Sequence, residues 1–508
     1  MTAPIMTAPT IRLHPADTVV IARDDLPAGL EIPGERVRCR TAIPRGHKLA
    51  TMDMPPGAPI LRYGQVIGFA AEAIAAGTHV HVHNVVLHDF AREAEAVWEA
   101  VTPWTQATES LSFQGFRRAD GRVGTRNYVA VLGTVNCSAT VVRQIAAAFP
   151  DAAVQAEFPG VDGVIAITHG SGCAMAADGE GLALLQRTLA GYARHPNVAA
   201  ALWVGLGCEV NHLAAQRQAT GDVTSSGLVI QDCGGTRATI AAGVARVREL
   251  LAEAARARRS PVPASSLVVG LQCGGSDSYS GISANPALGA AADRLVRQGG
   301  TVVLSETPEI YGAEHLLAQR AASPAVAARL MARIRWWEEY CARHGGSLDN
   351  NPSPGNKAGG LTTILEKSLG AIAKGGRSPL MAVYDYAQTT PGPGLVFMDT
   401  PGYDPCSATG QIAGGATLIA FTTGRGSVSG FKPAPCLKIA TNSTLFQTLP
   451  DDMDLNAGTI LDGSEDVEAC GARLFTRLLE VASGAQTCSE IQGFGDLEFV
   501  PWSLGAVM

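Results

Sequence analysis

Five apolar runs between Asn127 and Asp277 each end in a loop of small residues that carries a cysteine. Each run has the length of a buried strand, and parallel α/β sheets bind ligands just beyond the carboxyl ends of their strands. A thiolate at such a position acts as a nucleophile or a metal ligand. The pattern predicts an enzyme with one shared reaction site, and inert packing is the alternative for each cysteine. The cysteines are Cys137, Cys173, Cys208, Cys233 and Cys273.

None of these cysteines has CxxC spacing, so a zinc ribbon is not supported. Three or four thiols that converge from separate strand ends would suit iron or an iron–sulfur cluster. His169 and Glu209 stand beside two of the cysteines, and Glu306 and Glu309 end a later strand. We expect His169, Glu209 and Glu306 to be the candidates for general acid and base. Solvated surface carboxylates are the alternative for the glutamates.

The run THVHVHN places His79, His81 and His83 at alternate positions. Side chains alternate along a strand, so this spacing predicts three imidazoles on one face of a strand. Such a set suits a divalent metal such as Fe(II) or Zn(II). A solvent-facing edge of a β-rich domain is the alternative.

Four basic residues lie in loops that could bind a carboxylate. Arg122 and Arg126 belong to the run RADGRVGTRN, and guanidinium groups bind carboxylates in bidentate fashion. Lys357 follows a Gly/Pro-rich loop that opens a helix, where free backbone N–H groups favour an anion. Arg425 lies in the similar loop TTGRGS. The spacing does not match a P-loop, so we do not expect nucleotide binding. For each loop an ordinary solvated turn is the alternative.

These residues require elements that bring strand ends together. Residues 11–87 alternate short apolar stretches with Pro and Gly turns, which predicts a small β-rich domain. Residues 88–112 read as a linker with one short helix. Strand and helix patterns then alternate over 113–260 and 265–508, which favours two α/β domains with mainly parallel sheets. The prolines and serines of 260–266 mark the boundary between them.

Composition excludes several classes of protein. The 508 residues are 46% hydrophobic and 17% charged, as in a globular protein, and the formal charge of −7 provides no basic patch for nucleic acid. We expect no signal peptide and no membrane span. Eleven scattered cysteines indicate reduced thiols and a cytoplasmic location. The expected partner is a small molecule, and a homodimer is compatible with the sequence.

Several longer strings resemble the altronate/galactarate dehydratases along nearly the whole chain. They are GFRRADGRVGTRN, the HxxGC pattern at His169–Cys173, GLGCE, LQCGGSDSYSGISANPALG, GGTVVLSETPE, NPSPGNKAGGLTTILEKSLG and FTTGRGS. The run RGHKLATMDMPPGAPILRYGQVIGFA resembles the SAF (antifreeze-like, β-clip) domain at the front of these enzymes.

The resemblance implies a hydro-lyase that removes water from a sugar acid and forms a 2-keto-3-deoxy acid, with Fe(II) or a similar divalent metal. The string His81-Val82-His83-Asn84 favours altronate over galactarate. We expect His81 and His83 to hold the metal, with Cys173 or Cys208 as further ligands. The alternatives are a lyase on another hydroxy acid such as sulfolactate, and a non-catalytic sugar-acid sensor.

Overall fold

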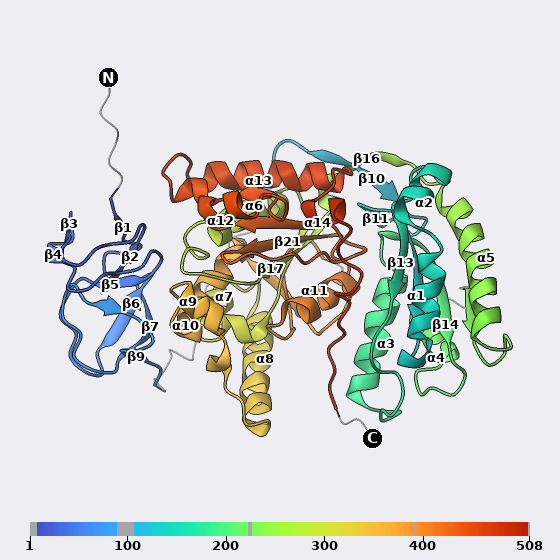
Figure 1. The fold of residues 1–508 in the computed structure, drawn as a ribbon, viewed down its shortest axis with the longest axis horizontal. Coiled ribbons are helices and arrows are strands. Elements are labelled where there is room, and N and C mark those ends of the chain that lie inside the picture. Colours follow the sequence, from blue (N-terminus) through green and yellow to red (C-terminus); the bar gives the residue numbers. More distant parts are fainter. Residues whose placement is uncertain (1–7, 89–105, 222–225, 391, 506–508) are drawn as a thin grey trace.

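The computed structural model describes residues 8–88, 106–221, 226–390 and 392–505. Three regions are distinguished below: an N-terminal β-region (8–88), a middle region (112–263) and a C-terminal region (264–505). The C-terminal region lies between the other two, so the middle region and the N-terminal β-region stand at opposite ends of the molecule (Figure 1). Most of the expected linker, 89–105, lies outside the described residues.

Short strands separated by Pro and Gly turns build the N-terminal β-region. One antiparallel sheet has the order β1-β2-β5-β8, a second has the order β6-β7-β9, and β3 pairs with β4. The strands are β1 (Thr10–Ile11), β2 (Val19–Ala22), β3 (Glu31–Ile32), β4 (Val37–Arg38), β5 (Lys48–Ala50), β6 (Pro59–Arg62), β7 (Gln65–Ala70), β8 (His79–Val80) and β9 (Val85–Val86).

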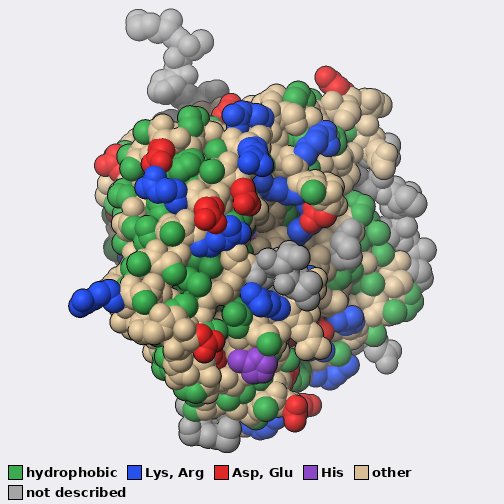
Figure 2. Space-filling view, turned by 90° about the vertical axis from the view of Figure 1, so that its right-hand side faces the viewer, with side chains coloured by type: hydrophobic (Ala, Val, Ile, Leu, Met, Phe, Trp, Pro, Cys, Tyr) green, Lys and Arg blue, Asp and Glu red, His purple; other side chains and the backbone are tan. Residues whose placement is uncertain are grey.

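The middle region has a parallel sheet in the order β13-β12-β14-β15. All six residues of β12 are buried, as expected for a strand that is covered on both faces. On the outer face of this region, acidic and basic side chains are interspersed (Figure 2). The elements are β12 (Tyr128–Gly133), α1 (Ala139–Ala147), α2 (Asp151–Glu157), β13 (Gly163–Ile167), α3 (Glu180–Ala193), β14 (Val198–Gly205), α4 (Leu213–Thr220), β15 (Ser226–Val229) and α5 (Thr236–Ala254).

A small antiparallel sheet joins the two α/β sheets. It contains β10 (Ser112–Arg117), β11 (Val123–Gly124) and β16 (Arg259–Pro263), in the order β11-β10-β16. The prolines and serines that were expected to interrupt regular structure near 260 thus lie partly within a strand. Pro261 and Pro263 fit there because β16 is an edge strand, where a missing N–H is tolerated.

The C-terminal region contains seven parallel strands in the order β19-β20-β18-β17-β21-β22-β23. From β17 the chain adds β18, β19 and β20 on one side of the sheet, with β19 outermost, and then β21, β22 and β23 on the other side. The topological switch point therefore lies between β17 and β21. Its strands are β17 (Val268–Cys273), β18 (Thr301–Leu304), β19 (Leu380–Tyr384), β20 (Gly394–Met398), β21 (Leu418–Thr423), β22 (Cys436–Ala440) and β23 (Leu455–Asn456). Its α-helices are α6 (Ala284–Arg297), α7 (Glu314–Ala318), α8 (Pro324–Arg343), α9 (Pro354–Ala358), α10 (Ile364–Ala371), α11 (Asp404–Ala413), α12 (Ser443–Thr448), α13 (Val467–Ala482) and α14 (Cys488–Ile491).

This architecture confirms the expected fold class, a β-rich region followed by α/β regions with parallel sheets. Among the described residues, no helix is long and apolar enough to cross a membrane.

Candidate active site

The switch point between β17 and β21 is the position at which a doubly wound sheet binds ligands. Asp277, in the loop after β17, is buried, and its carboxylate accepts hydrogen bonds from Ser280 and from Thr441 Oγ1. The loop after β21 approaches so closely that a Cβ on Gly424 would lie 2.1 Å from the Asp277 carboxyl carbon. Arg425, which follows Gly424, is exposed at this edge.

The N-terminal β-region packs on the same edge of the sheet. Tyr279, two residues after Asp277, donates to the Ala22 carbonyl at 3.0 Å. The loop between α9 and α10 contacts the start of β5, and a Cβ on Gly360 would lie 2.3 Å from the Gly46 oxygen. The Ala358 carbonyl oxygen lies 3.4 Å from His47 Nε2. Ala358 ends helix α9, so Lys357, the residue before it, also lies near this histidine.

Three imidazoles gather at this junction. His47, His79 and His81 each offer a nitrogen, and these atoms all lie within 4.8 Å of one another. His47 Nδ1 and His79 Nε2 are 2.9 Å apart, and the buried Nδ1 of His81 has no hydrogen-bond partner. Burial lowers the pKa of His79 to about 4 and that of His81 to about 3. Neutral imidazoles with an unpartnered nitrogen fit a divalent metal.

The expected histidine strand is shorter than the sequence pattern indicates. Strand β8 ends at Val80, and residues 81–84 form a turn in which Asn84 Oδ1 accepts from the His81 N–H while Asn84 Nδ2 donates to the His79 carbonyl. The prediction that all three histidines share one strand face is therefore wrong. The His83 ring lies near that of His79, with centroids 5.4 Å apart and the rings tilted, but His83 is outside the ligand group, which His47 completes instead.

A buried ion-pair network anchors this junction. Lys48 Nζ lies 2.9 Å from Glu366 Oε2, and Arg62 pairs with the other oxygen of the same carboxylate. Burial opposes the charge on Glu366, but Lys48 and Arg62 outweigh it and lower the pKa of Glu366 to about 2. Glu366 lies on α10 and the two cations on β5 and β6, so the pairs join the two regions.

A second ionisable group lies beneath the ends of β17 and β18. Lys374 Nζ lies 2.7 Å from Cys273 Sγ and 3.0 Å from Glu306 Oε2, and Lys367 Nζ lies 2.7 Å from Glu309 Oε1. Burial raises the pKa of Glu306 to about 7, against the attraction of Lys374. Glu306 also adopts a left-handed backbone with φ of 70°, and its Oε1 has no partner.

This second group offers a thiol and two carboxylates within 4.8 Å, so it also has the composition of a metal site. Two observations make it a poorer match than the three imidazoles. The Lys374 ammonium already occupies the space between these atoms, in contact with Cys273 Sγ and paired with Glu306 Oε2. Burial also raises the pKa of the Cys273 thiol to about 12, which disfavours the thiolate that metal ligation requires.

The other predicted ligands and acid–base residues lie in the middle region. Cys173 and Cys208 are exposed in the loops that follow β13 and β14. The middle region that holds them lies at the opposite end of the molecule from the N-terminal β-region (Figure 1). His169 is buried, with Nε2 3.1 Å from the Gly133 oxygen. Glu209 is buried and accepts hydrogen bonds from Thr134 Oγ1 and two backbone N–H groups. The five cysteine loops therefore do not form one site, because Cys273 belongs to a different sheet.

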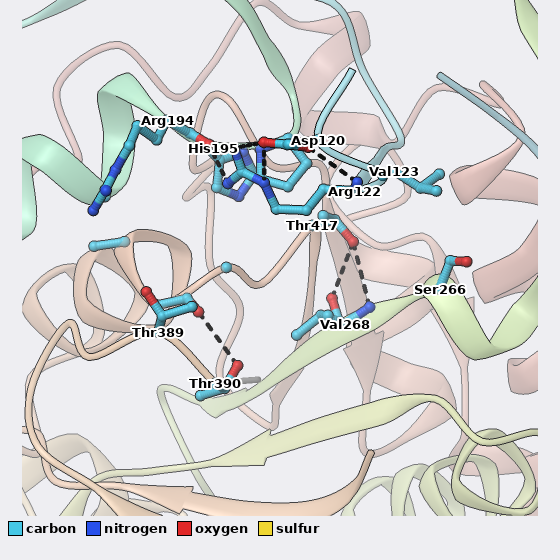
Figure 3. Close-up of a pocket in the computed structure, with 16 residues that line it drawn as sticks. Asp120, Arg122, Val123, Arg194, His195, Ser266, Val268, Thr389, Thr390 and Thr417 are labelled. Atoms are coloured by element: carbon cyan, nitrogen blue, oxygen red, sulfur yellow. Dashed lines mark hydrogen bonds and ion pairs between the residues drawn. The ribbon is translucent and has the colours of Figure 1, made fainter. Parts of the chain in front are cut away.

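The two arginines also lie away from the histidines. All five N–H groups of Arg126 are used, by Glu490 in bidentate fashion and by three backbone carbonyls, so none is left for a substrate. Arg122 pairs with Asp120 and donates to the Arg194 carbonyl at the rim of a cavity of about 620 Å³ between the middle and C-terminal regions (Figure 3). Of the four predicted carboxylate-binding residues, Lys357 and Arg425 alone flank the junction.

Comparisons with known proteins cover nearly the whole chain. Residues 8–88 match the altronate/galactarate dehydratase SAF domain, residues 115–255 match the second domain of D-galactarate dehydratase/altronate hydrolase, and residues 264–507 match the D-galactarate/altronate dehydratase C-terminal family. An altronate dehydratase of Escherichia coli (strain K12) is 36% identical over 96% of this chain and 98% of its own length.

Two further relatives agree. An altronate dehydratase of Bacillus subtilis (strain 168) is 34% identical, over 96% of this chain and 97% of its own. A galactarate dehydratase (L-threo-forming) of Escherichia coli (strain K12) is 38% identical, over 94% and 93%. This chain therefore belongs to the altronate/galactarate dehydratase family of hydro-lyases.

Proposed function

We propose that this chain dehydrates altronate to a 2-keto-3-deoxy acid, with a divalent metal, Fe(II) foremost, held by His47, His79 and His81. The observation that carries the proposal is the group of three neutral imidazoles where the N-terminal β-region meets the switch point of the C-terminal sheet. Altronate is preferred because the His81-Val82-His83-Asn84 string is present and two relatives are named altronate dehydratases.

The metal, when bound, would polarise the substrate's carboxylate and 2-hydroxyl and make the C2 proton more acidic. Lys357, in helix α9, and Arg425, in the loop after β21, supply positive charge beside the junction, which would orient an acid substrate.

We assign Glu306 as the acid–base residue. A carboxyl group with a pKa near 7 both accepts and releases a proton at neutral pH. Glu306 Oε2 lies 3.8 Å from Cys273 Sγ, and Cys273 borders a cavity of about 10 Å³ that Glu366 and Asp277 also line. In this scheme Glu306 takes the proton from C2 and delivers it to the departing 3-hydroxyl. The C3–O bond breaks, water leaves, and the resulting enol tautomerises to the keto acid.

The metal assignment is tested by loading the protein with Fe(II) without added sulfide and measuring bound iron. We expect His47→Ala, His79→Ala and His81→Ala each to lose most of the iron. His83→Ala serves as the matched control, because His83 lies on the same turn but outside the ligand group. Undiminished iron in His81→Ala would refute the assignment.

The substrate assignment is tested by anaerobic turnover of the iron-loaded enzyme with a panel of aldonates and aldarates. We expect keto-acid formation to be fastest with altronate. A higher kcat/KM for galactarate would reverse the preference. Release of sulfite from sulfolactate, without turnover of any sugar acid, would assign the chain to a different lyase reaction.

A further inference from the structure

Three exposed cysteines share one edge of the middle sheet. Of the eleven cysteines, Cys137, Cys173 and Cys208 are the three that are exposed. They follow β12, β13 and β14, which are neighbours in the order β13-β12-β14. Cysteine is among the residue types most often buried, so three exposed thiols on adjacent strand ends call for an explanation other than packing. The proposed dehydration uses none of them.

Backbone hydrogen bonds hold the three loops against one another. The Asn136 N–H, next to Cys137, donates to the Ser171 oxygen at 3.0 Å. The Asn211 N–H donates to the Gly172 oxygen at 3.0 Å, and Asn211 Nδ2 donates to the Thr134 oxygen at 2.7 Å. Gly172 has φ of +102°, and a Cβ there would lie 2.5 Å from the Thr134 oxygen. The loops are therefore fixed before any ligand binds.

Buried polar side chains fix the loops further. The Glu209 carboxylate turns inward and accepts from Thr134 Oγ1 at 2.6 Å and from the Gly207 N–H at 2.7 Å, while the adjacent Cys208 remains exposed. His169 Nδ1 accepts from the Ser171 N–H at 3.3 Å. His169 and Glu209 thus support the loops that carry Cys173 and Cys208, as residues behind a metal ligand do.

We propose that the middle region binds a [4Fe–4S] cluster through Cys137, Cys173 and Cys208, as a second metal site independent of the histidine site. One zinc or iron ion would need its thiolates about 3.8 Å apart, from metal–sulfur bonds of about 2.3 Å. Among the described residues, the groups with all ligand atoms within 4.8 Å do not include these thiols. A cluster holds its thiolates farther apart, because each binds a different iron.

Three thiolates leave the fourth iron open to a ligand from solution, such as the hydroxyl group of a hydroxy acid. On binding, each thiol releases its proton to solvent and forms one iron–sulfur bond. A [4Fe–4S]²⁺ cluster contains Fe(II) and Fe(III) in equal number, so its assembly from both ions and sulfide requires no further oxidant. Cys233, in the loop after the outer strand β15, is half-buried and is not assigned as a ligand.

The test is anaerobic reconstitution of the full chain with sulfide and an equimolar mixture of Fe(II) and Fe(III). We expect about four sulfides per chain, with the visible absorption of a cluster. Cys137→Ser, Cys173→Ser and Cys208→Ser should each lose most of the sulfide. Cys233→Ser, from the same sheet edge, and His81→Ala should keep it, which separates this site from the histidine site.

A second measurement does not depend on variants. Alkylation mapped by mass spectrometry should show that reconstitution protects Cys137, Cys173 and Cys208, all of which react in the untreated protein. Equal labelling before and after reconstitution would overturn the proposal. So would folded protein that incorporates no sulfide, or loss of the cluster in Cys233→Ser.

Discussion

Glu366 neutralises two cations that have no contact with water. The side chains of Lys48, Arg62 and Glu366 are at most 1% exposed. Removal of one partner from a buried network leaves an uncompensated charge, which costs far more free energy than loss of a surface pair. The Thr362 hydroxyl also donates to Glu366 at 2.7 Å, so the carboxylate is well solvated by the protein.

We expect Glu366→Gln to lower the free energy of unfolding by about 3–5 kcal/mol, because Lys48 and Arg62 would stay buried without a counter-charge. The measurement is thermal and urea-induced unfolding of the metal-free protein. Glu31→Gln is the control, since Glu31 pairs with Arg38 at a side-chain exposure of 75% and 66%, where an ion pair contributes little. Equal midpoints for Glu366→Gln and wild type would contradict this expectation.

Residue type predicted chemistry better than it predicted partners. Arginine forks in RADGRVGTRN indicated carboxylate recognition, and Arg126 does bind a carboxylate, but it is that of Glu490, 364 positions away. The sequence did not predict His47 as a ligand, because His47 contacts His79, 32 residues later in the chain, only through the pairing of β5 with β8. Both outcomes follow from long-range contacts, which local spacing does not encode.

At the scale of elements, the loop between α9 and α10 acts as a joint between the C-terminal region and β5. Gly360 has φ of +97°, which L-residues with side chains rarely adopt, and its Cα faces the Gly46 carbonyl. Lys48 also donates to the Gly360 oxygen at 2.6 Å. Close backbone approach at this point holds His47 beside the end of helix α9, which carries Lys357.

We expect Gly360→Ala to destabilise the protein by about 1–3 kcal/mol and to weaken iron binding, because the new Cβ would both strain the backbone and displace β5. Thermal unfolding and bound Fe(II) measure the two effects. Gly355→Ala, in the neighbouring helix α9, is the matched control, since its nearest neighbour atom would be 3.8 Å away. The expectation fails if both variants bind iron as tightly as wild type.

Elements with strong periodicity were the easiest to predict. The apolar run of β12 and the helical pattern near 326–344 reappear as a buried strand and as α8 (Pro324–Arg343). The THVHVHN run gave a wrong prediction, because alternation produces a strand only where backbone pairing continues. Here the pairing ends at Val80, and hydrogen bonds of Asn84 close a turn. The strand β16 was missed because its prolines are tolerated only at an edge, and edge position is a tertiary property.

At the scale of the whole molecule, the cavity between the two α/β regions lies near the amino ends of strands from both sheets. His195 and Thr417, at the cavity between the regions, precede the amino ends of β14 and β21 (Figure 3). The sites proposed above lie instead at carboxyl ends. His195 is 1% exposed and joins the regions, with Nε2 3.0 Å from the Ala416 oxygen. Its Nδ1 accepts from the Asn197 N–H at 3.0 Å.

These partners require neutral His195, because a proton on Nδ1 would face the Asn197 N–H. Burial lowers the pKa of His195 to about 3, below its ordinary 6.5, so its contribution to stability is present above pH 6.5 and is lost as pH falls toward 3. At about pH 5 the loss amounts to about 2 kcal/mol, from 1.36 kcal/mol per pH unit. The measurement is thermal unfolding of the metal-free protein at about pH 7.5 and about pH 5. We expect the difference in free energy of unfolding between these two pH values to be smaller in His195→Gln than in wild type, by about 2 kcal/mol. His344→Gln, at an exposed position, should match wild type. An unchanged pH dependence in His195→Gln would show that protonation of this residue does not control docking of the two regions.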